Sequence, residues 1–122
     1  MSVTITFLGM PPGTTSGELE NFSGDLIGAI TKTGAPNLSA EKVKCFFLPS
    51  MMSAGLGEEI RVFVDGLLIA STMPHAYDIR KELSRRICWT TKMRFPDAAV
   101  ECTIHPFDIP TGFWASNGQE HQ

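Results

Sequence analysis

The stretch VKCFFLP at residues 43–49 returns, with substitutions, as VECTIHP at residues 100–106, 57 positions further along the chain. Valine, cysteine and proline are kept at matching places. More matches fall at the same offset without a gap, and they are Gly9 with Gly66, Thr15 with Thr72, Leu26 with Leu83, Ile30 with Ile87, Thr33 with Thr90 and Gly55 with Gly112. One ungapped offset indicates an internal duplication, and a duplication fixes the architecture.

The duplication organises the whole chain. We expect a single domain over residues 1–122, with one repeat at 2–57, the other at 59–114 and a polar tail at 115–122. A chain of 122 residues can bury a core without disulfide staples. Its composition, 43% hydrophobic and 19% charged, is typical of a globular domain.

Each repeat predicts a strand, a helix and a second strand. Alternating apolar side chains predict four strands, which are residues 3–8, 43–48, 60–65 and 99–105. Apolar residues at helical spacing predict two helices, which are residues 16–33 and 73–91. The first strand of each repeat stops at a glycine, Gly9 or Gly66, and the second is closed by a proline.

A strand-helix-strand unit of this length pairs its strands in parallel and packs its helix on one face of the sheet. Two such β-α-β units predict an α+β fold, with a four-stranded sheet and two helices on one side. The same strand order also occurs in ferredoxin-like domains, including small-molecule sensors, and that alternative stays open at this point.

The helix-free face of the predicted sheet is uneven. Residues 99–105 direct Glu101, Thr103 and His105 to that face, whereas 43–48 is apolar on both faces, as in a strand buried on two sides. Something must therefore cover the second face of the sheet.

Composition excludes several classes of protein. The net charge of −3 argues against a nucleic-acid surface, and the sequence has no apolar run long enough for a membrane span and no secretory leader. Of the three cysteines, Cys45 and Cys102 are repeat partners on apolar strand faces, so we interpret them as small buried hydrophobes of a reducing, cytoplasmic compartment. No CxxC or paired-histidine spacing occurs, and we expect no metal and no cofactor.

Three local motifs point to a family. They are Thr33-Gly34-Ala35-Pro36 after the first helix, the proline-led, glycine-rich loop at 49–57, and Gly112-Phe113-Trp114 near the end. With the duplication, these make residues 2–114 resemble the tautomerase superfamily. Its larger members, such as macrophage migration inhibitory factor (MIF) and the carboxymethyl-hydroxymuconate isomerases, are single chains of two β-α-β units.

The resemblance implies a homotrimer. Members of the family wrap three sheets into a barrel with the helices outside, which would bury the helix-free face between subunits. Phe113 and Trp114 are large aromatics just before the polar tail, and we place them both at a subunit contact and among the substrate-binding residues.

The resemblance also implies a site with departures from the family pattern. The N-terminal proline that serves as base is replaced by Ser2, whose primary amine would be exposed by removal of Met1. The lysine of the Thr-Gly-Lys-Pro motif falls on Ala35, and we name Lys32 and Arg61 as its substitutes for substrate binding. On the polar strip of residues 99–105, Glu101 and His105 are predicted to be catalytic and Thr103 to bind substrate.

Two functions follow from this site. The first is a divergent keto-enol tautomerase or isomerase acting on a small carboxylated compound, with the Ser2 amine as base. The second is a non-catalytic protein that keeps the tautomerase scaffold and serves as a structural or small-molecule-binding protein.

Overall fold

A computed structural model of the protein describes residues 3–33, 35, 38–49, 59–68 and 74–106. Its elements are β1 (Val3–Met10), α1 (Ser16–Ile30), η1 (Thr31–Thr33), η2 (Ala40–Lys42), β2 (Val43–Pro49), β3 (Glu59–Leu67), α2 (Ala76–Arg94) and β4 (Ala99–Pro106), where η marks a short 3₁₀ helix. Ser2, Phe113, Trp114 and most of the three family motifs lie outside the described residues.

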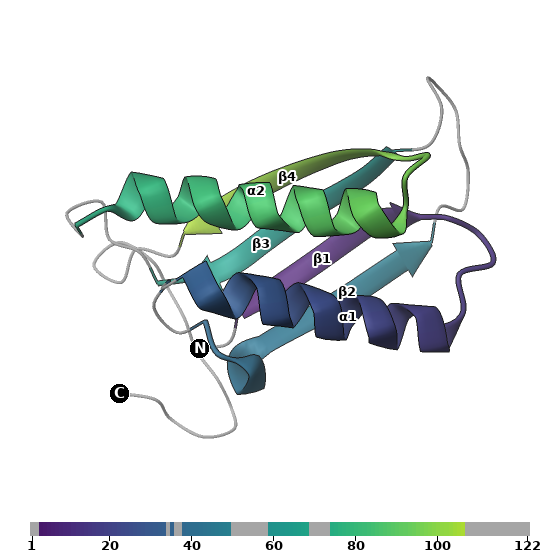
Figure 1. Ribbon diagram of the computed structural model, residues 1–122, viewed down its shortest axis with the longest axis horizontal. Coiled ribbons are helices and arrows are strands. Elements are labelled where there is room, and N and C mark those ends of the chain that lie inside the picture. Colours follow the sequence, from purple (N-terminus) through teal and green to yellow (C-terminus); the bar gives the residue numbers. More distant parts are fainter. Residues whose placement is uncertain (1–2, 34, 36–37, 50–58, 69–73, 107–122) are drawn as a thin grey trace.

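The four strands form one sheet in the order β2-β1-β3-β4. β1 pairs with β2 in parallel, β3 pairs with β4 in parallel, and the two units join through an antiparallel β1–β3 ladder. Both helices lie side by side on the same face of this sheet (Figure 1). The predicted α+β arrangement of two β-α-β units is confirmed, and the ferredoxin-like alternative, which requires antiparallel pairing throughout, is wrong.

The two strand glycines do not end their strands as the sequence predicted. Gly9 and Gly66 lie inside β1 and β3, and each has φ of +85°. The parallel ladders shift register at the same places, between Leu8 and Met10 and between Asp65 and Leu67. Glycine adopts this left-handed conformation without steric cost, so each strand bulges and then continues.

The ends of the helices follow local chemistry. Thr15 caps α1, where its hydroxyl accepts a hydrogen bond from the Glu18 backbone N–H at 3.2 Å. α2 is displaced from the predicted 73–91, since it begins at Ala76 and runs on to Arg94. It stops before Phe95, which precedes Pro96, because proline disfavours helical conformation in the residue before it.

The core lies between the sheet and the two helices, and positions 57 apart in the sequence take equivalent places in it. The equivalent pairs that are fully buried include Val3 with Ile60, Leu26 with Leu83 and Ile30 with Ile87. The first unit adds an aromatic cluster, in which the Phe7 and Phe22 rings meet edge to face with centroids 5.3 Å apart. Burial of these side chains fixes which sheet face stays open.

Candidate functional site on the helix-free face

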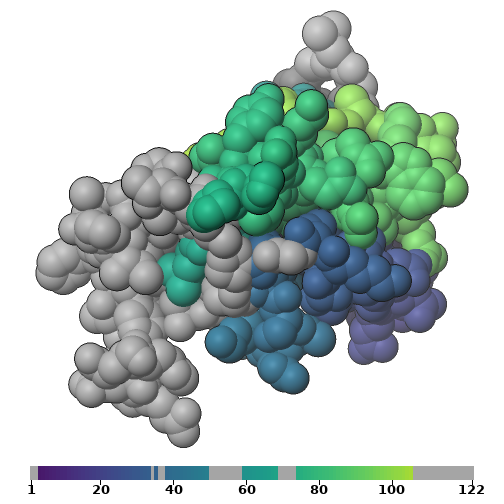
Figure 2. All heavy atoms as spheres, turned by 60° about the vertical axis from the view of Figure 1, so that its left-hand side comes forward, coloured from purple at the N-terminus to yellow at the C-terminus, as the bar shows by residue number. Residues whose placement is uncertain are grey.

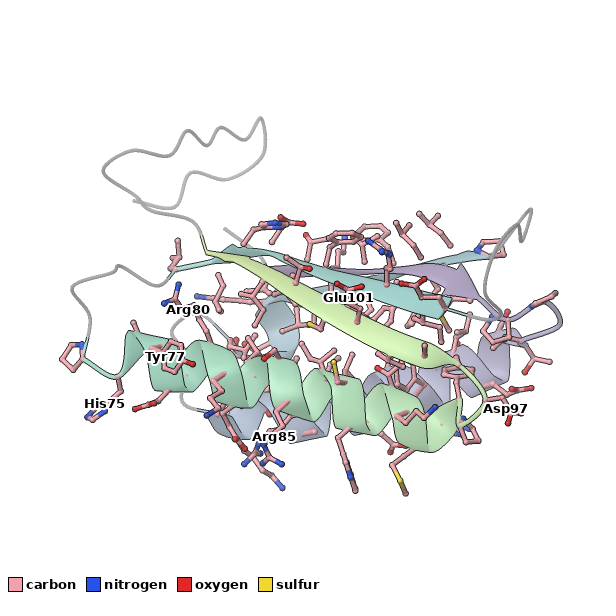
Figure 3. The ribbon with its side chains drawn as sticks, turned by 90° about the horizontal axis from the view of Figure 1, so that it is seen from above. His75, Tyr77, Arg80, Arg85, Asp97 and Glu101 are labelled. Atoms are coloured by element: carbon pink, nitrogen blue, oxygen red, sulfur yellow. The ribbon has the colours of Figure 1, made fainter. Side chains whose placement is uncertain are left out.

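The helix-free face of the sheet carries three rows of side chains that run across the strands. Strand register places the members of each row opposite one another, in the order β2, β1, β3, β4. The rows are Lys44-Thr4-Asp65-His105, Phe46-Thr6-Phe63-Thr103 and Leu48-Leu8-Arg61-Glu101. Figure 3 shows Glu101 on this face, with Tyr77, Arg80 and Arg85 of α2 on the other side.

Arg61 is held by two carboxylates. Its Nε lies 3.0 Å from Glu59 Oε1, and its Nη2 lies 3.5 Å from Glu101 Oε2. The three side chains are each about half exposed, so these ion pairs contribute little to stability. The two carboxylates offset the positive charge of Arg61. The guanidinium that was predicted to bind a substrate carboxylate is therefore already paired within its own chain.

His105 is paired with a carboxylate that the sequence analysis did not single out. Its Nδ1 lies 3.4 Å from Asp65 Oδ1 on the neighbouring strand. The imidazole also stacks on the Phe63 ring, with centroids 6.3 Å apart and planes 8° from parallel. A carboxylate at Nδ1 and a ring against one face orient the imidazole and leave Nε2 for another partner. The alternation of β3 already placed Asp65 on this face, but the sequence alone did not show which β4 residue it meets.

The structure does not bring the two predicted catalytic residues together. Glu101 and His105 lie four positions apart on β4, which is about 13 Å at roughly 3.3 Å per residue. Thr103 lies between them and is exposed. Within one subunit the two side chains therefore belong to different clusters, Glu101 with Arg61 and His105 with Asp65.

Two lysines lie toward the end of the sheet at which β1 begins. Lys32 is exposed on η1, directly after α1, and Lys44 belongs to the His105 row. Neither makes an ion pair with any residue that the structure describes. This end gathers the starts of β1 and β2 and the ends of β3 and β4 (Figure 1), and Figure 2 shows it turned forward, with the start of α2 above the end of α1.

The three cysteines have low reactivity in the folded protein. Cys45, Cys88 and Cys102 are free thiols on the core side of the sheet and on α2, each only partly exposed. Burial raises the pKa of Cys45 to about 11 and, together with the neighbouring Cys88 thiol, the pKa of Cys102 to about 12. Thiols in this state are poor nucleophiles and poor metal ligands at neutral pH.

Two further findings concern the described part of the chain. No three side chains of His, Cys, Asp or Glu within it gather closely enough to hold a metal ion. None of its helices has both the length and the apolar character needed to cross a membrane.

No protein-family model and no curated protein sequence matches this chain. Solved structures do. A fused 4-OT, described as a wild-type symmetric trimer, has a TM-score of 0.61 at 17% identity, with 98% of this chain and 94% of the other covered. The macrophage migration inhibitory factor of Toxoplasma gondii has a TM-score of 0.60 at 12% identity, with 98% of both chains covered.

A third structure, Pt0534 inactivated by 2-oxo-3-pentynoate, has a TM-score of 0.54 at 14% identity, with 87% of this chain and 86% of the other covered. Identities this low speak for the shared fold alone. The four-stranded mixed sheet with two helices described above is consistent with that fold. The chain therefore has the fold of the tautomerase superfamily, in its MIF-like form of two β-α-β units.

Proposed function

We propose that this protein is a cytoplasmic homotrimer that catalyses keto-enol tautomerisation of a small carboxylated compound. The observation that carries the proposal is the His105–Asp65 pair, with Nδ1 3.4 Å from Oδ1, at the end of the sheet where β1 begins. Ser2 directly precedes β1 in the sequence. The proposal therefore joins the Ser2 amine and the His105 imidazole in one site.

Tautomerisation moves one proton from carbon to oxygen, or back, and needs a base and an acid in reach of both atoms. An imidazole exchanges protons near neutral pH, which suits it to either role. In the proposed reaction, the Ser2 amine removes the proton from the carbon next to the keto group. The electron pair of that C–H bond forms the C=C bond, and His105 Nε2 gives a proton to the oxygen.

The substrate's carboxylate needs a cation. Arg61 was predicted for this role, but its ion pairs with Glu59 and Glu101 make it a weak candidate. Lys32 fits better, because it lies toward the same end of the sheet as His105 and has no ion-pair partner among the described residues. A small 2-oxo acid is the proposed substrate class, supported by the 2-oxo-3-pentynoate that inactivates Pt0534.

The homotrimer is proposed from the uncovered face. Phe46 and Leu48 of the edge strand β2 are 50% and 48% exposed. Leu8 of the neighbouring strand β1 lies directly opposite Leu48. Contiguous apolar groups of this kind mark contact surfaces. The fused 4-OT structures are trimers by description, which supports this number of subunits. Partly buried free thiols support a reducing compartment.

Hydrogen exchange of phenylpyruvate in D₂O, followed by proton NMR at the carbon next to the keto group, tests the proposal. Wild type should exchange faster than buffer, and Ser2→Pro should raise the rate by restoring a secondary amine. His105→Asn should lower it by about 100-fold, since loss of a general acid typically costs 10²–10⁴. An N-terminal extension should abolish exchange because the amine becomes an amide.

His75 offers a matched control. It too pairs with a carboxylate, with Nδ1 3.6 Å from Asp78 Oδ2, but it lies at the start of α2 on the helical side of the sheet (Figure 3), whereas His105 lies on the helix-free face. Its φ of 60° is left-handed, a conformation that asparagine tolerates, so His75→Asn should fold normally and keep full activity. Equal losses in the two variants would contradict the proposed role of His105.

A non-catalytic trimer is the second candidate, and the neutralised Arg61 favours it. In that case the chain lacks the proline base and the motif lysine, and Arg61, its proposed substitute, is already ion-paired. Absence of exchange in wild type and in Ser2→Pro alike, in protein that is still oligomeric, would establish this candidate.

A further inference from the structure

A groove on the outer, helical side of the molecule is independent of the site above. It lies between α1 and the C-terminal half of α2 and has a cavity volume of about 380 Å³. The residues that line it are Phe22, Asp25 and Ala29 of α1 and Trp89, Thr90, Met93 and Arg94 of α2. This volume is within the range of small-molecule sites, which often occur between helices.

The floor and walls of the groove are apolar. The Phe22 ring lies beneath the groove, where it is fully buried and packs edge to face on Phe95 with ring centroids 5.5 Å apart. Trp89 and Met93 form the α2 wall, and they are 63% and 65% exposed. An exposed indole and an exposed thioether both bind flat aromatic rings well.

The groove also carries one charge of each sign. Arg94 Nη2 donates to Asp25 Oδ2 at 2.9 Å, which joins α2 to α1. Each partner keeps further capacity, because a guanidinium has five N–H donors and a carboxylate has about four acceptor positions. The Asp25 carboxylate is 65% exposed, and the Arg94 side chain is 34% exposed.

We propose that this groove binds the zwitterion of a free aromatic amino acid. The ring packs on the exposed Trp89 and Met93 side chains of α2, the α-carboxylate accepts hydrogen bonds from the further N–H groups of Arg94, and the α-ammonium donates to Asp25. Each charge of the ligand thus lies next to the protein group of opposite charge. The Asp25–Arg94 hydrogen bond stays in place. A ligand with one charge satisfies only half of this arrangement.

Nearby contacts hold the two helices in the position that the groove needs. Arg86 Nη1 donates to the Ala29 carbonyl at 2.9 Å, and Arg86 Nε donates to Glu82 at 2.8 Å. The small side chain of Ala29 leaves space beside this contact. Arg86 does not line the groove, whereas Arg94 does, so Arg94 is the guanidinium within reach of a ligand carboxylate there.

Titration of the wild-type protein with L-phenylalanine, followed by the indole N–H signals in proton–nitrogen NMR, tests the proposal. The chain has two tryptophans, and Trp114→Phe assigns the signal of Trp89. L-phenylalanine should shift the Trp89 signal with millimolar affinity, as expected for a solvent-exposed site. The compounds 3-phenylpropionate, without the ammonium, and phenethylamine, without the carboxylate, should each bind about tenfold more weakly.

Variants locate the head group. Asp25→Asn and Arg94→Gln should each weaken binding of L-phenylalanine by about tenfold, and Trp89→Leu should weaken it similarly. Arg85→Gln is the matched control, since Arg85 is an exposed arginine of α2 outside the groove. No shift of the Trp89 signal by L-phenylalanine would overturn the proposal. Equal binding of either single-charge analogue to wild type would overturn it as well, whatever the stability of the variants.

Discussion

Thr6 and Phe63 lie 57 positions apart in the sequence and face each other directly as Cα partners in the antiparallel β1–β3 ladder. An antiparallel pair of equivalent residues is the signature of a local two-fold axis, which here passes between Thr6 and Phe63. The neighbours obey the same symmetry, because Ile5 pairs with Val64 and Phe7 pairs with Val62. The two units are thus related by a half turn about the centre of the sheet.

The bulge at Gly9 predicts a steric cost. A Cβ at Gly9 would overlap the carbonyl oxygen of Glu59, and its φ of +85° disfavours other residues. Gly9→Ala should lower the free energy of unfolding by at least about 2 kcal/mol, measured by urea denaturation at fixed protein concentration. Gly28→Ala on the exposed side of α1 is the control, since nothing lies within 4 Å of the new Cβ. It should raise stability by about 0.5–1 kcal/mol, and a Gly9→Ala protein as stable as wild type would contradict the bulge.

The symmetry of the core predicts similar costs at equivalent positions. Leu26 and Leu83 are both fully buried, one in each helix. Leu26→Ala and Leu83→Ala should each lower the free energy of unfolding by about 2–5 kcal/mol because both leave a cavity in the same layer. Leu19→Ala, at a partly buried position of α1, should cost clearly less. A large cost at only one of the two leucines would show that the units do not share the core equally.

The raised thiol pKa of Cys45 predicts slow alkylation. A rise from 9.0 to about 11 lowers the thiolate fraction at pH 8 about 100-fold relative to the unfolded chain. Folded protein should therefore react with iodoacetamide about 100-fold more slowly at Cys45 than protein in urea, as read by peptide mass spectrometry. The native rate should keep rising about tenfold per pH unit beyond pH 9, where the rate of the unfolded chain levels off. Equal rates at pH 8 would mean that Cys45 is not shielded.

The exposed apolar side chains of β2 predict that a charge introduced among them dissociates the proposed trimer. Wild type should have a mass near three times 13.3 kDa by light scattering. Phe46→Lys places an ammonium in the proposed contact face, where its desolvation is costly, and should give monomers. Tyr77→Lys is the control, because Tyr77 is 67% exposed on α2, on the helical side. Wild type that is monomeric at micromolar concentration would rule the trimer out.

Periodicity predicted the faces of the elements well. Alternation in β4 identified Glu101, Thr103 and His105 as one strip, and the structure exposes all three on the helix-free face. The helical spacing of α1 likewise identified the buried Phe22 and Leu26. The face that a side chain occupies depends only on the period of the backbone, which is two residues in a strand and about 3.6 in a helix. A short stretch of sequence is therefore enough to predict it.

The sequence did not predict which side chains lie opposite each other on neighbouring strands. Which residues face Arg61 depends on the register of three neighbouring strands, β1, β3 and β4. Hydrophobic alternation fixes only which face a side chain occupies, so it did not show that Asp65 pairs with His105. The roles of Ser2, Phe113 and Trp114 stay predictions, because these residues lie outside the described part of the chain.

The antiparallel β1–β3 junction also marks where the protein can be split into two fragments. All contacts within a unit, including both parallel ladders, stay intact if the chain is cut between Pro49 and Glu59, so each half retains a complete β-α-β motif. Among the described residues, the halves then meet mainly through the β1–β3 ladder and through contacts of α2 with α1 and η1. Such a division suits split-protein complementation, in which two separately expressed fragments restore the native sheet only when they are brought together.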